Sequence, residues 1–268
     1  MNPENGQKFL FFSNSCDPYD NLVLEELLWE NYSAQHQVYL VYVNKPCVVI
    51  GRHQNPWQET RPSALRGAGI PLLRRISGGG TVWHDEGNIN FSWMGPRALY
   101  HRQIVDYWIQ KALAPFDFSF DISAKGDYLY KGAKFSGNAF AFRSDRVLHH
   151  GTLLVQSDLV RLKSYMGGIR FAQSVGVPSR PAVVMNLQEA NREIRIDALL
   201  KTLEEATGLT YRVPPKFLEE KTLRQLRQSE AWILGETPRF VVHEAGGHIV
   251  EVVNGKIDDH YFDEELVG

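Results

Sequence analysis

Two arginines, a serine and three glycines stand close together between Arg74 and Asp85, and short apolar runs flank them. Glycine reaches backbone angles that are closed to other residues and lets a ligand approach the main chain. Bare amides in such a loop can bind an anion, and neighbouring guanidiniums can pair with it. On the glycine triplet alone, a plain hairpin is an equally good interpretation. The flanking arginines and the following His84–Asp85 pair favour an anion-binding loop.

A pair of histidines, His149 and His150, also suggests chemistry, because imidazoles are common metal ligands. The pair lies in the run 147–155, whose apolar residues are typical of a strand. Adjacent strand residues point to opposite faces of a sheet. No further group of ligand-type residues accompanies the pair, so we expect no dedicated metal site.

The elements that must position these residues alternate between helix and strand. Apolar periodicity and capping residues predict helices over 18–32, 100–114, 196–207 and 215–228, with Gly208 ending the third. Strands are expected over 37–43, 47–50, 88–94, 147–155, 240–243, 249–253 and 256–261. In the third of these, Ile89, Phe91 and Trp93 alternate with Asn90 and Ser92, which indicates a half-buried strand.

Several neighbouring strands are joined by hairpin-type turns, Asn254-Gly255 among them. The fold class is therefore predicted as α/β (α+β), with a mixed, largely antiparallel sheet flanked by helices. Neither a G-x-G-x-x-G dinucleotide loop nor a G-x-x-x-x-G-K-[ST] phosphate loop occurs in the sequence.

Composition limits the functional class. The chain has 268 residues, 43% of them hydrophobic, and a formal net charge of -2, so it has no basic field to attract nucleic acid. It carries two cysteines, too few for a disulfide framework, and no apolar run of membrane-spanning length. The N-terminal residues lack the build of a signal peptide. We therefore expect a cytoplasmic protein that binds neither a membrane nor nucleic acid.

Four segments, taken in order, resemble the lipoate–protein ligase family. They are 49–57, the glycine-rich stretch 74–88, Lys134-Phe135-Ser136-Gly137-Asn138-Ala139, and His149-His150-Gly151-Thr152-Leu153-Leu154. The resemblance extends over about 18–240. It implies a core similar to that of biotin ligases and class II aminoacyl-tRNA synthetases. It also implies a reaction in which lipoate and Mg-ATP give lipoyl-AMP, and the lipoyl group then passes to a lysine of a lipoyl carrier domain.

The resemblance implies roles for individual residues. Lys134 would be the catalytic cation, since it lies among small residues that leave room for a ligand. From its position alone, a solvated strand lysine would be the better interpretation. Residues implied to bind lipoate or lipoyl-AMP are Tyr42, Arg75, Ser77, Gly78, Gly79, Gly80, His84, Asn90, Ser136 and Gly137. Residues implied to bind the nucleotide, with Asp127 a candidate for Mg²⁺ as well, are Thr81, Val82, Trp83, Asp127, Ala139, His150, Gly151 and Thr152.

The implied acyl tunnel must be apolar, because lipoate has an aliphatic tail and a dithiolane ring. Tyr42 corresponds to an aromatic position at the far end of this tunnel, and Asn90 would lie along the neighbouring strand. A plain core role for Tyr42 is equally consistent with the sequence.

Three functions compete. The leading one is an ATP-dependent lipoate–protein ligase. The second is an ATP-independent transferase that moves octanoyl or lipoyl groups between carriers, and the third is a non-catalytic lipoate-binding subunit. No cysteine lies near Lys134, which argues against a thioester mechanism but not against an amidotransferase that uses the lysine alone. The joint presence of Lys134, Arg75 and the glycines argues against a non-catalytic subunit.

Two domains are expected: 1–235 as the catalytic domain and 236–268 as a short or truncated accessory segment. Only about 30 residues follow Pro238, fewer than a full accessory domain of the family needs. The accessory domain is therefore truncated, minimal, or supplied by a separate chain. The implied protein partner is a lipoyl carrier domain, such as that of a 2-oxoacid dehydrogenase E2 or the glycine cleavage H protein.

Overall fold

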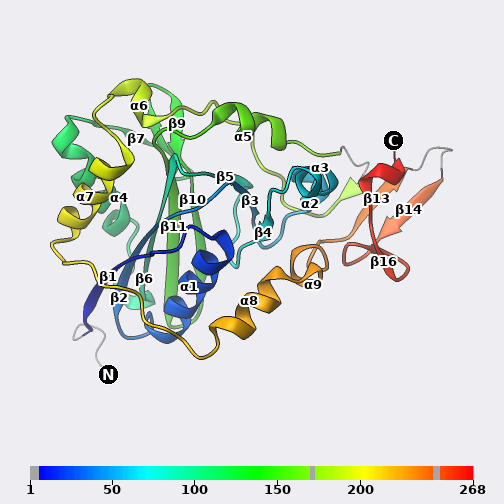
Figure 1. Cartoon of the computed structure of the whole chain (residues 1–268), viewed down its shortest axis with the longest axis horizontal. Coiled ribbons are helices and arrows are strands. Elements are labelled where there is room, and N and C mark those ends of the chain that lie inside the picture. Colours follow the sequence, from blue (N-terminus) through cyan, green and yellow to red (C-terminus); the bar gives the residue numbers. More distant parts are fainter. Residues whose placement is uncertain (1–5, 170–172, 244–247, 268) are drawn as a thin grey trace. The chain divides into compact units, whose positions relative to one another are not determined.

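The computed structural model describes residues 6–169, 173–243 and 248–267. The chain divides into two compact units, each built from three separate segments (Figure 1). Unit 1 contains residues 1–45, 84–158 and 182–220, and unit 2 contains 46–83, 159–181 and 221–268. No helix within the described ranges is long and apolar enough to cross a membrane.

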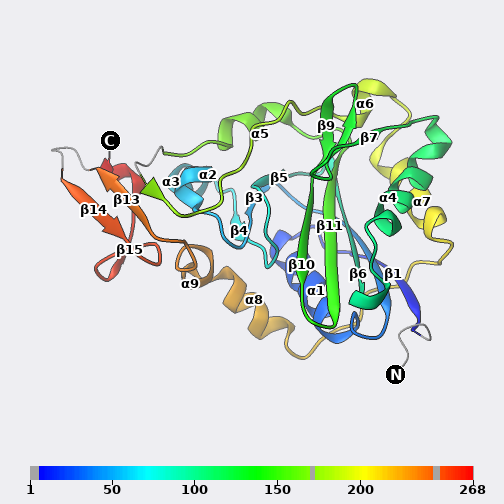
Figure 2. The same ribbon diagram turned by 180° about the vertical axis from the view of Figure 1, so that it is seen from behind.

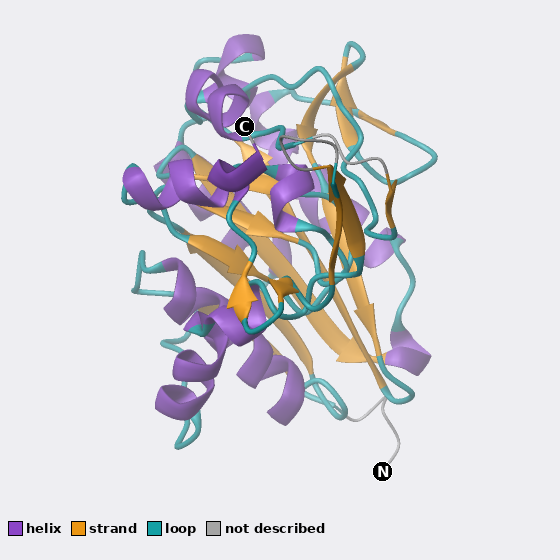
Figure 3. Cartoon of the chain, turned by 90° about the vertical axis from the view of Figure 1, so that its right-hand side faces the viewer, coloured by secondary structure: helices purple, strands orange, loops and turns teal. Residues whose placement is uncertain are grey.

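Unit 1 is organised around a five-stranded sheet whose strand order is β1-β2-β6-β11-β10. The pair β1–β2 is parallel and the other three pairs are antiparallel. The long strands run side by side in Figures 2 and 3. Their bounds are β1 Lys8–Phe12, β2 Gln37–Val43, β6 Asn88–Pro96, β10 Asn138–Phe142 and β11 Arg146–Leu154. A smaller antiparallel sheet has the order β7-β8-β9, with β7 Asp121–Ile122, β8 Tyr128–Tyr130 and β9 Ala133–Ser136.

Helices cover both faces of the large sheet. Helices α4 and α7, neighbours in Figure 2, pack on one face, where Trp108 Nε1 donates to the carbonyl of Leu203 at 3.0 Å. Helix α1 covers the other face through Glu25. The bounds are α1 Pro18–Asn31, α4 Gln103–Leu113, α6 Leu187–Ala190 and α7 Ile196–Thr207, with short 3-10 turns at Arg97–Leu99 and Ala114–Phe116. The predicted fold class is therefore confirmed.

Strand β6 differs from its prediction. All nine of its residues are buried, including Asn90 and Ser92, which are 2% and 0% exposed. The half-buried pattern expected from the sequence is wrong, because α1 covers the polar face and brings Glu25 to bond Ser92. Hydrogen bonding allows polar side chains to be buried at little cost, so their alternation in the sequence did not mean exposure.

Three of the four predicted helices are found close to their expected limits, whereas the one expected over 215–228 begins at Glu220. Asp17 caps α1 by accepting from the amides of Tyr19 and Asp20, and Pro18 occupies the first helical position, where its missing N–H costs nothing. Helix α7 ends at Gly208, whose φ of +68° is the left-handed conformation that glycine adopts easily.

Unit 2 contains a three-stranded sheet with the order β4-β3-β5. A small apolar core lies next to this sheet. It includes the buried Ile50 and Trp83, and Tyr165 packs against this core. The elements are β3 Cys47–Ile50, α2 Pro56–Glu59, α3 Pro62–Gly67, β4 Leu72–Arg74, β5 Val82–His84, α5 Leu159–Tyr165, β12 Gln173–Ser174, α8 Glu220–Gln228 and α9 Glu230–Ile233.

The end of the chain adds further strands to unit 2: β13 Phe240–His243, β14 Ile249–Val252, β15 Lys256–Ile257 and β16 His260–Tyr261, then a 3-10 turn at Glu264–Val267. The turn expected at Asn254-Gly255 is present, bridged by Val253 and Lys256. The single strand expected over 256–261 is wrong, because the chain reverses at Asp258, with φ +51°, and β15 pairs with β16.

The described residues of 236–268, namely 236–243 and 248–267, include side chains that pack within unit 2. The Trp57 ring lies 5.6 Å from Phe240 and 5.3 Å from Phe262, and Glu264 accepts hydrogen bonds from the backbone and side chain of Ser63 at 2.6 Å. These contacts describe packing and not the division of labour, so the functional boundary expected at residue 235 stays a prediction.

We expect Phe240→Ala to lower the free energy of unfolding by about 3–5 kcal/mol, the usual cost of removing a large buried aromatic side chain. Ile249→Ala, at a position 67% exposed on the next strand, is the matched control and should change stability by less than about 0.5 kcal/mol. Urea unfolding followed by tryptophan fluorescence measures both. Equal, small effects would mean that the end of the chain is not part of the core of unit 2.

Candidate functional site

The glycine-rich loop of unit 2 is held in shape by Arg75. Its guanidinium donates to the carbonyls of Gly78 at 2.5 Å and Gly80 at 2.7 Å, and to Ser77 Oγ at 3.0 Å. The residue is only 6% exposed. Arg75 therefore places a buried positive charge directly beneath the loop, and the contact with an anionic ligand stays a prediction.

A second loop, which follows β3, packs against the glycines. A Cβ atom on Gly51 would lie 2.3 Å from the carbonyl oxygen of Gly79, so only glycine allows this approach. The amide of Arg52 donates to the carbonyl of Ser77 at 2.8 Å. Gly79 itself has a φ of +86°. The backbones of the two loops are therefore in direct contact, and this contact requires glycine at both Gly51 and Gly79.

Thr81, at the end of the glycine loop, is fixed by side chains from other parts of unit 2. Its hydroxyl lies 2.9 Å from both Gln54 Oε1 and Glu59 Oε2, and its amide donates to Ser179 Oγ at 2.8 Å. Gln54, Glu59 and Ser179 were missed by sequence analysis. The first two lie in or next to the segment 49–57 that carries part of the family resemblance, which was the available signal.

The next two residues, Val82 and Trp83, belong to β5. The Trp83 ring is 1% exposed and stacks on Tyr165 with ring centres 5.6 Å apart. Its side chain is therefore part of the core of unit 2, and a contact of this segment with a nucleotide stays a prediction.

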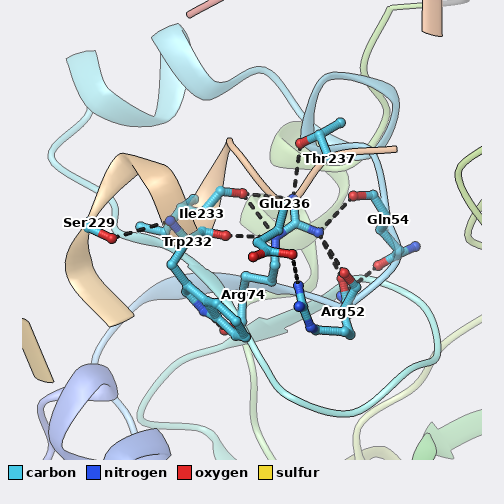
Figure 4. A network of polar contacts seen from close by, with 9 residues as sticks. Arg52, Gln54, Arg74, Ser229, Trp232, Ile233, Glu236 and Thr237 are labelled. Atoms are coloured by element: carbon cyan, nitrogen blue, oxygen red, sulfur yellow. Dashed lines mark hydrogen bonds and ion pairs between the residues drawn. The ribbon is translucent and has the colours of Figure 1, made fainter. Parts of the chain in front are cut away.

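Arg74, the neighbour of Arg75, forms a buried network drawn in Figure 4. Its guanidinium donates to the carbonyls of Trp232 and Ile233 and to Thr237 Oγ1, all near the end of the chain. It also donates to the carbonyls that follow β3, with the distances to Gly51, Arg52 and Gln54 being 3.3, 3.0 and 2.8 Å. Burial, together with the charge of Arg52, lowers the pKa of Arg74 to about 10, and Glu236 opposes this shift.

Lys134 lies in unit 1, on β9. Its Nζ is 2.8 Å from Asp127 Oδ1, and the two side chains are 28% and 27% exposed. A Cβ on Gly137 would lie 3.0 Å from Nζ, so the small residue leaves the ammonium accessible from that side. Ser136 Oγ is buried and has no hydrogen-bond partner among the described residues. The structure thus places Lys134, Asp127, Ser136 and Gly137 together.

Four predicted site residues form one row across the large sheet. Tyr42 pairs with Asn90, Asn90 pairs with Thr152, and the amide of Thr152 donates to the carbonyl of Gly137 at 3.2 Å. Directly paired residues of antiparallel strands share a face. In the same way His150 pairs with Ala139 on one side and with Ser92 on the other. The predicted residues of these strands, except Gly151, therefore occupy the α1 face of the sheet.

Glu25 of α1 was not predicted from the sequence, yet it connects this face. Its carboxylate lies 2.8 Å from His150 Nδ1, 2.5 Å from Ser92 Oγ and 3.5 Å from Tyr42 Oη. It is 1% exposed. A glutamate on a helix is usually exposed, so its burial could not be predicted from the sequence. His150 is engaged with its carboxylate in this structure.

His84 is held from another direction in unit 1. Its Nδ1 lies 3.0 Å from Asn44 Nδ2, and Asn44 Oδ1 accepts from Asn21 at 2.7 Å. Asp85 accepts from Ser157 Oγ at 2.9 Å. These bonds fix the strand end that leaves the glycine-rich stretch, and a contact of His84 with lipoate stays a prediction.

His149 faces the side of the sheet opposite to His150, as strand alternation predicts. It lies 3.2 Å from Tyr100 Oη and 3.0 Å from Asn138 Oδ1, and Asn138 in turn donates to the carbonyl of Gly126 at 2.7 Å. Gly126 directly precedes Asp127. Burial, together with the nearby His150 and Arg102, lowers the pKa of His149 to about 3. Among the described residues no group of three or more His, Cys, Asp or Glu side chains is arranged for a metal ion.

Comparison with known proteins identifies the family. The model of the family described as "Lipoyl protein ligase A/B catalytic domain" matches residues 17–208. The chain belongs to this family. A protein of Bdellovibrio bacteriovorus named lipoate-protein ligase A is 34% identical over 247 residues, which are 86% of this chain and 73% of that protein. This lipoyl ligase homologue is therefore an enzyme of the ligase class.

Solved structures share the fold of this ligase. P. falciparum LipL1 in complex with lipoate has a TM-score of 0.77 at 22% identity, covering 92% of this chain and 80% of its own. A lipoate-protein ligase A bound with ATP has a TM-score of 0.67 at 20% identity, covering 85% and 97%. A bipartite lipoate protein ligase from Thermoplasma acidophilum, described with its E2 lipoyl domain, has a TM-score of 0.65 at 20% identity, covering 85% and 96%.

The lowered pKa of His149 predicts a loss of stability in acid. In the unfolded chain His149 is protonated below about pH 6.5, whereas in the folded ligase it stays neutral down to about pH 3. The free energy of unfolding therefore falls as pH drops below 6.5. Between pH 7 and pH 5 this group should cost about 2 kcal/mol of unfolding free energy. We expect His149→Gln to lose that part of the pH dependence in urea unfolding. The exposed His101→Gln is the control, and a His149→Gln curve parallel to wild type would contradict the assignment.

Proposed function

We propose that this ligase joins lipoate to a lysine side chain of a lipoyl carrier domain in two steps driven by ATP. First, a lipoate carboxylate oxygen attacks the α-phosphorus of ATP and pyrophosphate leaves. Then the neutral amine of the acceptor lysine attacks the acyl carbon of lipoyl-AMP, AMP leaves and the amine loses a proton. The names of its relatives support this: a lipoate-protein ligase A, a homologous fold in complex with lipoate, and another bound with ATP.

The observation that carries the proposal is the placement of Lys134. Adenylation brings a carboxylate to a phosphate that is already anionic, so the site must supply fixed positive charge. Lys134 offers a partly exposed ammonium beside a glycine, with a carboxylate 2.8 Å away to hold it in place. In this role its Nζ binds the lipoate carboxylate and the phosphate, and later the acyl carbonyl as charge develops there.

The glycine loop is the proposed partner of the phosphate and acyl-phosphate groups. Arg75 lies buried beneath it, and the close packing of Gly51 and Gly79 fixes the direction of its backbone. Loops of this kind bind anions through their amides. Thr81 to Trp83, together with Ala139 and His150 to Thr152, remain the proposed nucleotide contacts.

Mg²⁺ is proposed to arrive with ATP. Bound Mg²⁺ would neutralise phosphate charge, and Asp127 is the residue proposed to hold it. Magnesium is commonly bound by one or two carboxylates and by substrate phosphates. The single, partly exposed carboxylate of Asp127 next to Lys134 fits an ion that is shared with the substrate phosphates, and not an ion enclosed by protein ligands alone.

The acyl chain is proposed to lie along the α1 face of the sheet. Tyr42 and Asn90 are neighbours there, and both are nearly fully buried, at 4% and 2% exposure. Tyr42 also approaches Glu25, so its ring has a fixed position. A fixed ring at the end of a tunnel would limit the length and bulk of the acyl group.

The proposed protein partner is a lipoyl carrier domain of the E2 or H-protein type. The Thermoplasma ligase is described as bipartite, and by analogy residues 236–268 are proposed as a short accessory segment that assists adenylation, with a separate chain as the alternative source of that help. Lipoate-dependent exchange of pyrophosphate into ATP by the purified chain tests this proposal. Exchange without a second protein would mean that the chain adenylates lipoate unaided.

We expect Lys134→Ala to reduce both pyrophosphate exchange and lipoyl transfer by about 10²–10³-fold, the usual effect of removing a donor to developing charge. Lys125→Ala, at an exposed position nearby, is the matched control and should behave as wild type. The far-ultraviolet circular dichroism of both variants should match wild type. A folded Lys134→Ala enzyme with normal turnover would rule out the catalytic assignment.

We expect Tyr42→Ala to shift the relative rates toward longer or bulkier carboxylic acids, because it opens the proposed end of the acyl tunnel. Tyr39→Ala is the control for cavity formation alone, since Tyr39 is buried three residues along the same strand and contacts Trp108 on the other face. Rates for a series of acids of increasing length measure the shift. If both variants show the wild-type order of preference, Tyr42 is a core residue only.

A further inference from the structure

The two successive arginines of the glycine-rich stretch serve different loops. Arg75 donates to the glycine loop itself, whereas Arg74 donates to the loop after β3 and to the segment Trp232–Thr237. Neighbouring residues of an extended chain point to opposite sides, so a single step along the backbone separates the two sets of contacts. The role of Arg75 is part of the proposed site, but the role of Arg74 is not.

Arg74 is buried to 2% exposure, and the acceptors that the described residues offer it are all neutral oxygens. Five are backbone carbonyls and one is the Thr237 hydroxyl. A buried charge that loses its acceptors is strongly destabilised. The network therefore requires that the loop 51–54 and the segment 232–237 keep their places at the same time.

Contacts around Trp232 reinforce the link in the reverse direction. Its Nε1 donates to the carbonyl of Arg74 at 2.7 Å, so each residue donates to the backbone of the other. The guanidiniums of Arg52 and Arg227 lie 4.4 and 3.7 Å from the centre of its ring. Arg52 also pairs with Glu236 at 2.7 Å. Figure 4 shows Arg52, Arg74, Trp232 and Glu236 close together.

The loop 51–54 passes this constraint on to the glycines. The amide of Arg52 donates to the carbonyl of Ser77, Gly51 approaches Gly79, and Gln54 reaches the hydroxyl of Thr81. A displacement of the loop after β3 would therefore move the backbone of residues 77–81. The chain of contacts runs from the segment 232–237 through Arg74 and the loop 51–54 to the glycine loop.

We propose that Arg74 is a positioning residue, through which the segment Trp232–Thr237 sets the conformation of the glycine loop. The inference rests on the proposed function in so far as that loop binds the phosphates of ATP. Arg74 does not touch the substrate in this role. It makes the order of the loop depend on a part of the chain about 160 residues further on.

The test uses Arg74→Lys in the full chain, together with the pair Thr237→Val and Thr237→Ser. Lysine keeps the charge but cannot reach both segments with a planar fork. Valine removes one acceptor of Arg74, whereas serine keeps the hydroxyl. Amide hydrogen exchange, followed by mass spectrometry, measures the order of residues 77–81 without requiring activity, and the KM for ATP is measured alongside it.

We expect Arg74→Lys to accelerate exchange in 77–81 and to raise the KM for ATP, each by about 10-fold or more, since hydrogen bonds to a charged group are worth at least that factor. Thr237→Val should shift both in the same direction by a smaller factor, and Thr237→Ser should match wild type. Exchange in β6 of unit 1 should be unchanged. If Arg74→Lys does not fold, the two Thr237 variants still decide.

The inference is overturned if the loop exchanges at the wild-type rate in Arg74→Lys and Thr237→Val. It is also overturned if exchange rises equally in β6, because that would indicate general destabilisation. The proposed function fails separately, through an absence of lipoate-dependent pyrophosphate exchange in the wild-type chain. Faster loop exchange together with that absence would keep the positioning role and remove the ligase chemistry.

Discussion

The burial of two adjacent guanidiniums, those of Arg74 and Arg75, is the constraint on which unit 2 depends. Neither charge can be left without acceptors inside the protein, because desolvation of an ion costs several kcal/mol. Backbone carbonyls meet the need, and they do so only if several loops are brought into fixed positions around strand β4. The cations thus impose an arrangement on chain segments that have little regular structure of their own. Glycines at Gly51 and Gly79 are the steric counterpart of this requirement, since carbonyls can converge closely only where side chains are absent.

Unit 1 solves a related problem with a negative charge. Its main sheet is covered on both faces, and the α1 face carries amide, hydroxyl and imidazole groups that would be costly to bury alone. Glu25 meets several of them at once, and the paired rows across the strands keep Tyr42, Asn90 and Thr152 in register. Buried polar groups that satisfy one another are rigid, and rigidity suits the role proposed for this face, the recognition of an acyl chain by its shape. The same sheet uses its other face for an ordinary apolar core with α4 and α7.

Much of this structure follows from local sequence signals. The cap at Asp17, the end of α7 at Gly208 and the alternation around His149 and His150 are decided by neighbours within a few residues, and the structure agrees with them. The motif puts small residues beside Lys134, and the structure has Gly137 next to its ammonium, while the roles of Lys134 and the glycine loop stay predictions. What the sequence could not give are the contacts over long separations. Glu25 meets a histidine 125 residues away and Arg74 meets Ile233, 159 residues away. No periodicity encodes such pairs, and for the same reason alternation alone predicts a solvated polar face for β6.

The hydrogen bonds around His149 can be satisfied in one direction only. Tyr100 keeps its proton, because burial raises its pKa to about 12, so its hydroxyl is able to donate a hydrogen bond to Nδ1 of the ring. Asn138 donates through its amide nitrogen to the carbonyl of Gly126, so its Oδ1 faces the ring as an acceptor. The neutral ring must then carry its proton on Nε2 and donate a hydrogen bond to that oxygen. Reversing any one member would set two oxygens or two hydrogens against each other. The tautomer of His149, which lies outside the proposed site, is therefore fixed by its hydrogen bonds to the turn that places Asp127 beside Lys134.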